Sequence, residues 1–193
     1  MTRQNPSLLV GNIYHIYNRA VADNLLFNNS DNYHLFLSRI RIHLEESADI
    51  LAYCLMPNHY HLLVQLKNND LPNSMQKLAL SYVVPFNRSY KRSGHLFQGK
   101  YQRKQVDDDN YLLHLSRYIH LNPLSAGLVK RASDWRYSSL PVYYGITQSD
   151  FVRTDIVLDL FDDPIGTPMI ERRFSYKKFI EEWDPEFMTF KEK

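Results

Sequence analysis

Short apolar runs and helical apolar spacings alternate along the first 125 residues of the chain. The short runs are rich in β-prone residues and predict strands over residues 10–18, 50–56, 59–66 and 96–106. The helical spacings predict helices over residues 31–46, 73–92 and 108–122. The first six elements follow the βαββαβ order of a ferredoxin-like antiparallel sheet, an α+β fold, and the last helix is an addition to it. The first and third strands should then lie at the centre of the sheet.

Polar residues and helix breakers mark the boundaries of these elements. Ser30 or Asp31 is a candidate cap for the first helix, and Pro57-Asn58 predicts a turn between the second and third strands. Pro85 should kink or break the second helix, and Pro123 should end the third, because proline lacks an N–H and clashes with the preceding turn.

The pattern weakens after Gly127, which divides the chain into two predicted regions. Residues 9–125 form one domain and residues 126–193 a helical, acidic C-terminal extension. In residues 1–150, Lys and Arg outnumber Asp and Glu by 16 to 11, whereas in residues 151–193 the acids outnumber the bases by 10 to 7. The positive charge therefore belongs to the first region.

Bulk composition is that of a globular protein. The chain has 193 residues, of which 44% are hydrophobic, so it can bury a substantial core. Cys54 is the one cysteine and cannot form an intrachain disulfide, which fits a reducing compartment. No apolar stretch approaches the roughly 20 residues of a membrane span, and the N-terminus lacks the apolar core of a signal peptide. We therefore expect a cytoplasmic protein without a membrane partner.

Basic and aromatic residues are interleaved over residues 88–104, a stretch without an acidic residue. Its aromatic residues are Tyr90, Phe97 and Tyr101. Cations that hold phosphates and rings that stack on bases are typical of single-stranded nucleic-acid binding, although a charge run is also typical of a solvated loop. The candidate DNA-binding residues are Arg19, near the first strand, and Arg88, Lys91, Arg92, Lys100, Arg103 and Lys104.

The candidate chemistry begins with His59 and His61, which open the third predicted strand. Side chains at positions i and i+2 of a strand point to the same face, so the two imidazoles should converge. Imidazole is a common ligand of divalent transition metals. The alternative is a pair of ordinary sheet histidines that are hydrogen-bonded to carbonyl groups.

A polar stripe on the last predicted helix supplies further candidates. His114, Tyr118 and Asn122 are spaced four residues apart and share one helix face. Taken alone, such a tyrosine is typical of a core or interface position, and an asparagine before Pro123 is typical of a helix end.

Four ordered segments resemble the HUH single-tyrosine transposases, and among them the REP-associated tyrosine transposase branch. Residues 53–64 read YCLMPNHYHLLV and are similar to the His-hydrophobe-His signature, with Tyr60 in place of a simple aliphatic residue. On a strand, Tyr60 should pack on the face opposite the histidines. The other three segments are HIYNR at 15–19, GHLFQGKY at 94–101 and YIHLNP at 118–123, and the resemblance covers about residues 9–125, as an HUH transposase-like catalytic domain.

The resemblance implies metal-dependent cleavage and rejoining of single-stranded DNA at hairpins of repetitive palindromic elements. Tyr118 matches the nucleophile, which forms a 5′-phosphotyrosine intermediate. His59 and His61 match the metal ligands, and Asn122 lies where related enzymes carry a glutamine ligand. The implied ion is Mg²⁺ or Mn²⁺, of which imidazole ligands tolerate Mn²⁺ better.

Other interpretations stay open at this point. A non-catalytic module that binds single-stranded nucleic acid on a ferredoxin-like sheet would explain the basic and aromatic stretch, but not the histidine pair. A two-histidine phosphoesterase requires two His-x-Ser/Thr strands, and His114-Leu115-Ser116 matches on a predicted helix instead. Related insertion-sequence enzymes are dimers that exchange tyrosine helices, whereas the REP-associated branch implies a monomer, so monomer and homodimer are both considered.

Overall fold

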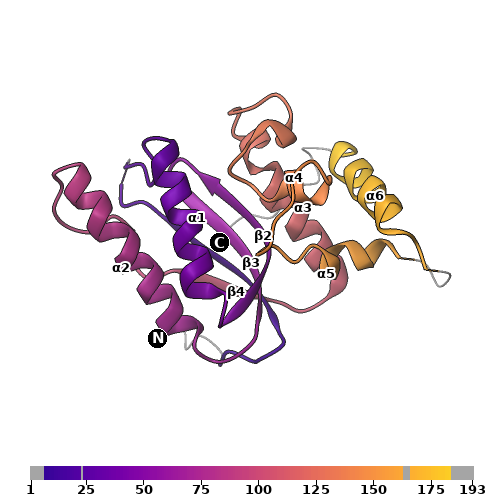
Figure 1. Ribbon diagram of the computed structural model, residues 1–193, viewed down its shortest axis with the longest axis horizontal. Helices are drawn as coiled ribbons and strands as arrows, with labels where there is room; N and C mark the ends of the chain where they lie inside the picture. Colours follow the sequence, from indigo (N-terminus) through magenta and orange to yellow (C-terminus); the bar gives the residue numbers. More distant parts are fainter. Residues whose placement is uncertain (1–6, 23, 163–165, 184–193) are drawn as a thin grey trace.

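A four-stranded antiparallel sheet forms the centre of the computed structural model, which describes residues 7–22, 24–162 and 166–183. Within these residues the strands lie in the order β2-β3-β1-β4 (Figure 1). Their bounds are β1 Ile13–Arg19, β2 Ala48–Met56, β3 His59–Leu66 and β4 Gln102–Val106. The predicted ferredoxin-like α+β fold is confirmed, with β1 and β3 at the centre of the sheet.

Two helices cover one face of the sheet, namely α1 (Ser30–Leu44) and α2 (Leu71–Ser89) (Figure 1). Tyr60 lies on this face, 2% exposed, and its ring centroid is 5.0 Å from that of Phe36 of α1. The prediction that Tyr60 packs away from the histidines is therefore confirmed. The other face carries α3 (Asp109–Ser125) and the C-terminal elements.

Both helices that contain an internal proline continue past it, so a break at Pro85 and the predicted end at Pro123 are wrong, and the alternative of a kink at Pro85 stays a prediction. Each proline removes one hydrogen bond to the carbonyl four residues before it and crowds that turn, which costs about 3 kcal/mol or more in a helix interior. Packing outweighs that cost, because Phe86 of α2 and Leu121 of α3 are each 1% exposed.

Two further boundaries differ from the prediction. Asn29, rather than Ser30 or Asp31, caps α1, and its side chain accepts a hydrogen bond from the N–H of Asn32 at 3.1 Å. Strand β4 begins six residues later than predicted, and Phe97 forms an isolated bridge with Ala20. Between that bridge and the Tyr17–Gln102 pair, residues 98–101 lie opposite Asn18 and Arg19, so the chain bulges there. Gly99, in this bulge, has a φ of +157°, a conformation that favours glycine.

Residues after α3 cover the outer edge of β2. These elements are η1 Ala132–Asp134, α4 Leu140–Tyr143, α5 Asp155–Leu158, η2 Asp159–Phe161 and α6 Met169–Glu181. The N–H of Leu55 donates to the carbonyl of Tyr137 at 2.9 Å, and the N–H of Ser139 donates to the carbonyl of Tyr53 at 3.0 Å. An uncovered edge strand would present these groups to other chains, so the extension protects the sheet.

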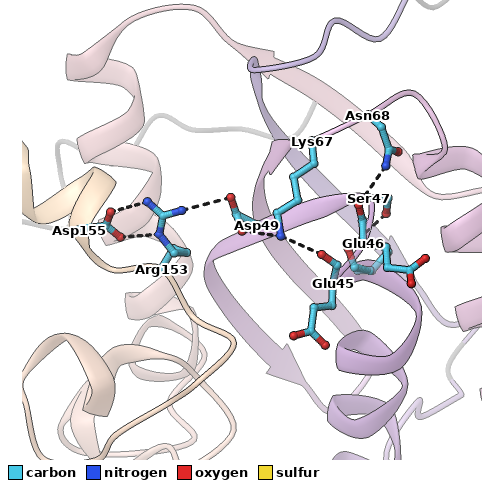
Figure 2. A network of polar contacts seen from close by, with 9 residues as sticks. Glu45, Glu46, Ser47, Asp49, Lys67, Asn68, Arg153 and Asp155 are labelled. Carbon is cyan, nitrogen blue, oxygen red and sulfur yellow. Dashed lines mark hydrogen bonds and ion pairs between the residues drawn. The ribbon is translucent and has the colours of Figure 1, made fainter.

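An ion-pair network joins the end of the sheet to these elements (Figure 2). Asp49 of β2 contacts Lys67 at 2.9 Å and Arg153 at 3.3 Å, and Arg153 pairs with Asp155 of α5 at 2.5 Å. These partly exposed pairs each contribute little to stability, on the order of 0–1 kcal/mol. Their effect is to fix where the chain turns into α5.

The division into residues 9–125 and 126–193 stays a prediction, and parts of the extension, 163–165 and 184–193, lie outside the described residues. In the part of the chain that is described, no helix is both long and apolar enough to cross a membrane.

Candidate metal and tyrosine site

The sheet brings His59 and His61 together on the face that α3 covers. Their ring centroids are 5.0 Å apart and the rings are nearly perpendicular, at 83°. His61 is 1% exposed, and His59 is half-buried at the start of β3. The i, i+2 spacing on a strand produces this convergence.

A neighbouring side chain contacts Nδ1 of each imidazole. Asn58 Oδ1 lies 2.7 Å from Nδ1 of His59, and because an amide oxygen can only accept, this contact favours the His59 tautomer with its proton on Nδ1. Nδ1 of His61 lies 3.0 Å from Nε2 of His15, a buried residue of β1. A metal ion could therefore reach either ring only through Nε2.

Burial keeps these imidazoles neutral. It lowers the pKa of His59, against a side-chain hydrogen bond with Asn122 that raises it, and it lowers the pKa of His61 well below the usual value. Burial, with a smaller effect of the Lys104 charge, lowers the pKa of His15 to about 4. Neutral imidazole is the form that binds metal ions, so the site is prepared for one at neutral pH.

Helix α3 places Tyr118 and Asn122 beside the histidine pair. The helix begins after Asp108, whose side chain accepts a hydrogen bond from the N–H of Tyr111 at 2.7 Å. The Tyr118 ring meets His61 edge-on, with centroids 5.6 Å apart. The Asn122 side chain donates to the carbonyl of Tyr118 at 3.0 Å, one helical turn back, and also bonds to His59.

The donor set fits a divalent metal ion. Two neutral imidazoles and the Asn122 amide leave further coordination positions for phosphate oxygens or water, as a catalytic site requires. No cluster of three or more His, Cys, Asp or Glu side chains that could hold a metal occurs in the described part of the chain. The ion would thus depend on an amide or on the substrate to complete its coordination.

A cleft of about 650 Å³ lies next to the histidine pair. Asn18 donates to the carbonyl of Gly99 at 3.0 Å, so the bulge before β4 forms one wall, and Arg19 hydrogen-bonds Gln98. The lining of the cleft combines amides, cations and aromatic rings. The lining residues are Tyr17, Asn18, Arg19, Asn58, His59, Tyr60, His61, Gln98, Gly99, Lys100 and Gln102.

The predicted DNA-binding residues separate into distinct groups. Arg19 and Lys100 line the cleft. Lys104 lies on the same face of the sheet, opposite His15 in the ladder, with its ammonium 4.9 Å from the centre of the Tyr111 ring. Arg103 points to the opposite face. The remaining three lie at and after the C-terminal end of α2, away from the cleft lining, namely Arg88, Lys91 and Arg92.

The other histidines of α3 have structural contacts. His114 accepts a hydrogen bond from Arg117 at 2.9 Å and packs against the ring of Phe179. His120 is fully buried and bonds the Tyr176 hydroxyl and the Ser139 hydroxyl, each at 2.7 Å. Neither histidine joins the site, although His114 shares the predicted stripe with Tyr118.

Sequence reasoning assigned no role to His15, Asn58 or Gln98. The alternation of the first strand does place His15 on a common face with Tyr17, and a buried imidazole on a central strand is a usable signal. Its contact with His61 depends on strand order, which joins residues 46 positions apart in the chain.

Comparisons with known proteins agree with this geometry. Residues 10–122, more than half of the chain, match the family described as IS200-like transposases. A Haemophilus influenzae protein named as a REP-associated tyrosine transposase is 32% identical over an alignment of 103 positions, and the match covers 47% of this chain. The match spans 58% of that relative's length, less than two thirds.

Solved structures include a similar fold. The structure of a REP-associated tyrosine transposase bound to a REP hairpin superposes with a TM-score of 0.63. The two chains are 18% identical, and the match covers 87% of this chain and 98% of the other. At this level of identity the similarity concerns the fold.

Proposed function

This chain belongs to the IS200-like transposase family, and from that premise we propose that it cleaves and rejoins single-stranded DNA through Tyr118. The observation that carries the proposal is the position of Tyr118, whose ring lies 5.6 Å from that of His61 in the same chain. Helix α3 also brings the Asn122 amide to the same histidine pair. A nucleophile that meets a metal-bound phosphate requires that arrangement.

The reaction is a transesterification at phosphorus. The Tyr118 hydroxyl loses its proton and forms a bond to phosphorus, while the bond from phosphorus to the 3′ oxygen breaks. The products are a 5′-phosphotyrosine and a free 3′-hydroxyl, which takes up a proton. Attack by that or another 3′-hydroxyl reverses the step and rejoins a strand, because one ester bond replaces another.

His59, His61 and Asn122 would hold a divalent ion, Mg²⁺ or Mn²⁺, for this step. When bound, the ion supplies positive charge that orients the phosphate and stabilises the transition state. Neighbouring side chains would orient these ligands. Asn58 and His15 contact the two imidazole rings, and the hydrogen bond from Asn122 to the Tyr118 carbonyl restrains the Asn122 amide.

The tyrosine and the histidines would act within one subunit. Tyr118 and Asn122 reach the pair of their own chain, so no exchange of helices is needed to assemble the site. We therefore propose a monomer as the active unit.

Single-stranded DNA with hairpins of repetitive palindromic elements is the proposed substrate. The structural neighbour is bound to a REP hairpin, and the cleft of this chain carries Arg19 and Lys100 next to the histidine pair. Cationic side chains in such a cleft would hold the phosphates on either side of the scissile bond.

The test is formation of a covalent adduct. Wild-type protein, incubated with Mn²⁺ and a labelled single strand that contains a hairpin, should give a protein–DNA band that survives denaturing electrophoresis. Tyr118→Phe should abolish the band and leave DNA binding intact in a mobility-shift assay. Tyr111→Phe, on the same helix, is the matched control and should keep the adduct. An adduct in Tyr118→Phe contradicts the assignment, and binding without any wild-type adduct favours a non-catalytic module.

Removal of the imidazoles tests the metal assignment. His59→Ala and His61→Ala should each lower the adduct yield at least 100-fold. The site has two imidazole ligands, and one imidazole alone would not hold the ion. The measurement is adduct yield against Mn²⁺ concentration. Unchanged Mn²⁺ dependence in both variants would rule out the pair as ligands.

A further inference from the structure

The geometry points to His15 of β1 as a positioning residue that sets which nitrogen of His61 carries the proton. The inference deepens the proposed function, on which the metal role of His61 rests. It assigns a task to a buried imidazole that neither attacks phosphorus nor holds the ion.

The contact between the two rings is short and enclosed. Nε2 of His15 lies 3.0 Å from Nδ1 of His61, within hydrogen-bonding distance. His15 is 4% exposed and His61 is 1% exposed. The Tyr17 ring stacks on His15 with centroids 4.9 Å apart, which restrains the rotation of the His15 ring.

The strand register builds this contact into the sheet. His61 lies opposite Tyr17 and His15 lies opposite Leu63 in the antiparallel pairing of β1 and β3. His15 and His61 are therefore diagonal neighbours on one face, within reach of large side chains. A slip of one residue would move His15 to the other face.

One hydrogen bond between two neutral imidazoles contains one proton, so two arrangements are possible. If His15 donates, His61 accepts through Nδ1 and carries its own proton on Nε2, which then cannot bind a metal ion. If His61 donates from Nδ1, its Nε2 presents a lone pair to the ion. Metal binding by His61 therefore requires His15 to be the acceptor.

Asn58 has the corresponding effect on His59, where it favours a proton on Nδ1 and leaves Nε2 for the ion. The Asn58 side-chain oxygen, 2.7 Å away, can only accept, so it holds the His59 proton on Nδ1. Acceptors of this kind behind metal-binding histidines orient the ring and fix its tautomer. His15 would supply the matching acceptor for His61.

Nuclear magnetic resonance of the metal-free protein tests this directly. With ¹⁵N-labelled histidine, long-range ¹H–¹⁵N correlations identify the protonated nitrogen of each ring. The expected result is a proton on Nδ1 of His61 in the wild type. A wild-type His61 that carries its proton on Nε2 would overturn the proposal without any variant.

Two substitutions separate an acceptor role from packing. His15→Gln places an amide oxygen near the position of Nε2, so it should keep the His61 tautomer. His15→Leu removes the acceptor and should shift His61 toward the Nε2–H form, and Mn²⁺ affinity by titration calorimetry should fall about 10- to 100-fold. Unchanged tautomer and affinity in His15→Leu would also overturn the proposal.

Tyr14→Phe is the matched control, because Tyr14 is buried next to His15 on β1 and faces away from the site. It should leave the His61 tautomer and the Mn²⁺ affinity unchanged. If His15→Leu does not fold, the wild-type and His15→Gln spectra still decide the question. A missing DNA adduct with the expected tautomer would contradict the proposed function alone, so the two failures are distinguishable.

Discussion

Neighbouring residues of β4 illustrate how a strand divides a charge run. Arg103 and Lys104 are adjacent in sequence, and they point to opposite faces of the sheet. Lys104 shares its face with the histidine pair, whereas Arg103 lies on the face of α1 and α2. Arg103 therefore starts from the face opposite Lys104, and Arg19 and Lys100, which line the cleft beside the histidine pair, are the candidates that we test first for phosphate contacts.

The salt dependence of DNA binding tests those cations. Arg19→Ala and Lys100→Ala should each reduce the slope of log affinity against log salt by about 0.7 for each lost phosphate contact with a single strand. Arg41→Ala is the control, since Arg41 is not among the residues that line the cleft. Its guanidinium pairs with the Asp150 carboxylate at 2.5 Å. Equal slopes for the wild type and the cleft variants would argue against phosphate contacts there.

At the scale of elements, the most consequential contact is the one between α3 and α6. The Tyr176 hydroxyl of α6 bonds His120 at 2.7 Å and Ser116 at 3.0 Å, and all three residues are 0% exposed. Arg117 lies over the Phe179 ring at 3.9 Å and donates to the Phe179 carbonyl at 3.2 Å. Helix α6 thus holds α3 through contacts that lie within two residues of Tyr118, the proposed nucleophile.

Loss of the Tyr176 hydroxyl should weaken this attachment. Tyr176→Phe keeps the ring but leaves buried His120 and Ser116 without this partner, so we expect the free energy of unfolding to fall by about 1–3 kcal/mol. Urea denaturation measures the change. Phe174→Ala, at a position of α6 that is 70% exposed, is the control and should change stability by less than about 0.5 kcal/mol. A Tyr176→Phe variant as stable as the control would show that the network contributes little.

At the scale of the whole molecule, buried neutral histidines connect stability to pH. Burial lowers the pKa of His120 to about 3 and, with the Lys104 charge, that of His15 to about 4. Their pKa in the unfolded chain is near 6.5. Between those pH values the histidines are protonated in the unfolded state and neutral in the folded state. Their contribution to the free energy of unfolding is therefore fully present above about pH 6.5 and is lost as the pH falls.

Acid should therefore destabilise the metal-free protein well above the pKa of its carboxylates. Each of these histidines should lower the free energy of unfolding by up to about 1.4 kcal/mol per pH unit between pH 6 and pH 4.5. Urea denaturation at pH 7, 6 and 5 measures the slope. His120→Gln should give a shallower slope than the wild type, and an identical slope would show that His120 is not among its causes.

The spacing of residues along the sequence was sufficient to predict the order of the main helices and strands and part of the candidate site. The strand and helix periods predicted the ferredoxin-like order, and the spacing of His59 and His61 on a strand and of Tyr118 and Asn122 on a helix predicted two pairs of aligned side chains. These are properties of neighbouring residues, which backbone geometry dictates without reference to the rest of the chain.

Contacts between segments that are distant in the sequence could be seen only in the tertiary structure. Strand order placed His15 behind His61, packing carried α3 past Pro123, and the extension buried His120 against Tyr176 instead of exposing it to the site. Such contacts depend on which faces meet when apolar surface is buried, and that choice is made by the whole chain at once, so no local pattern contains it.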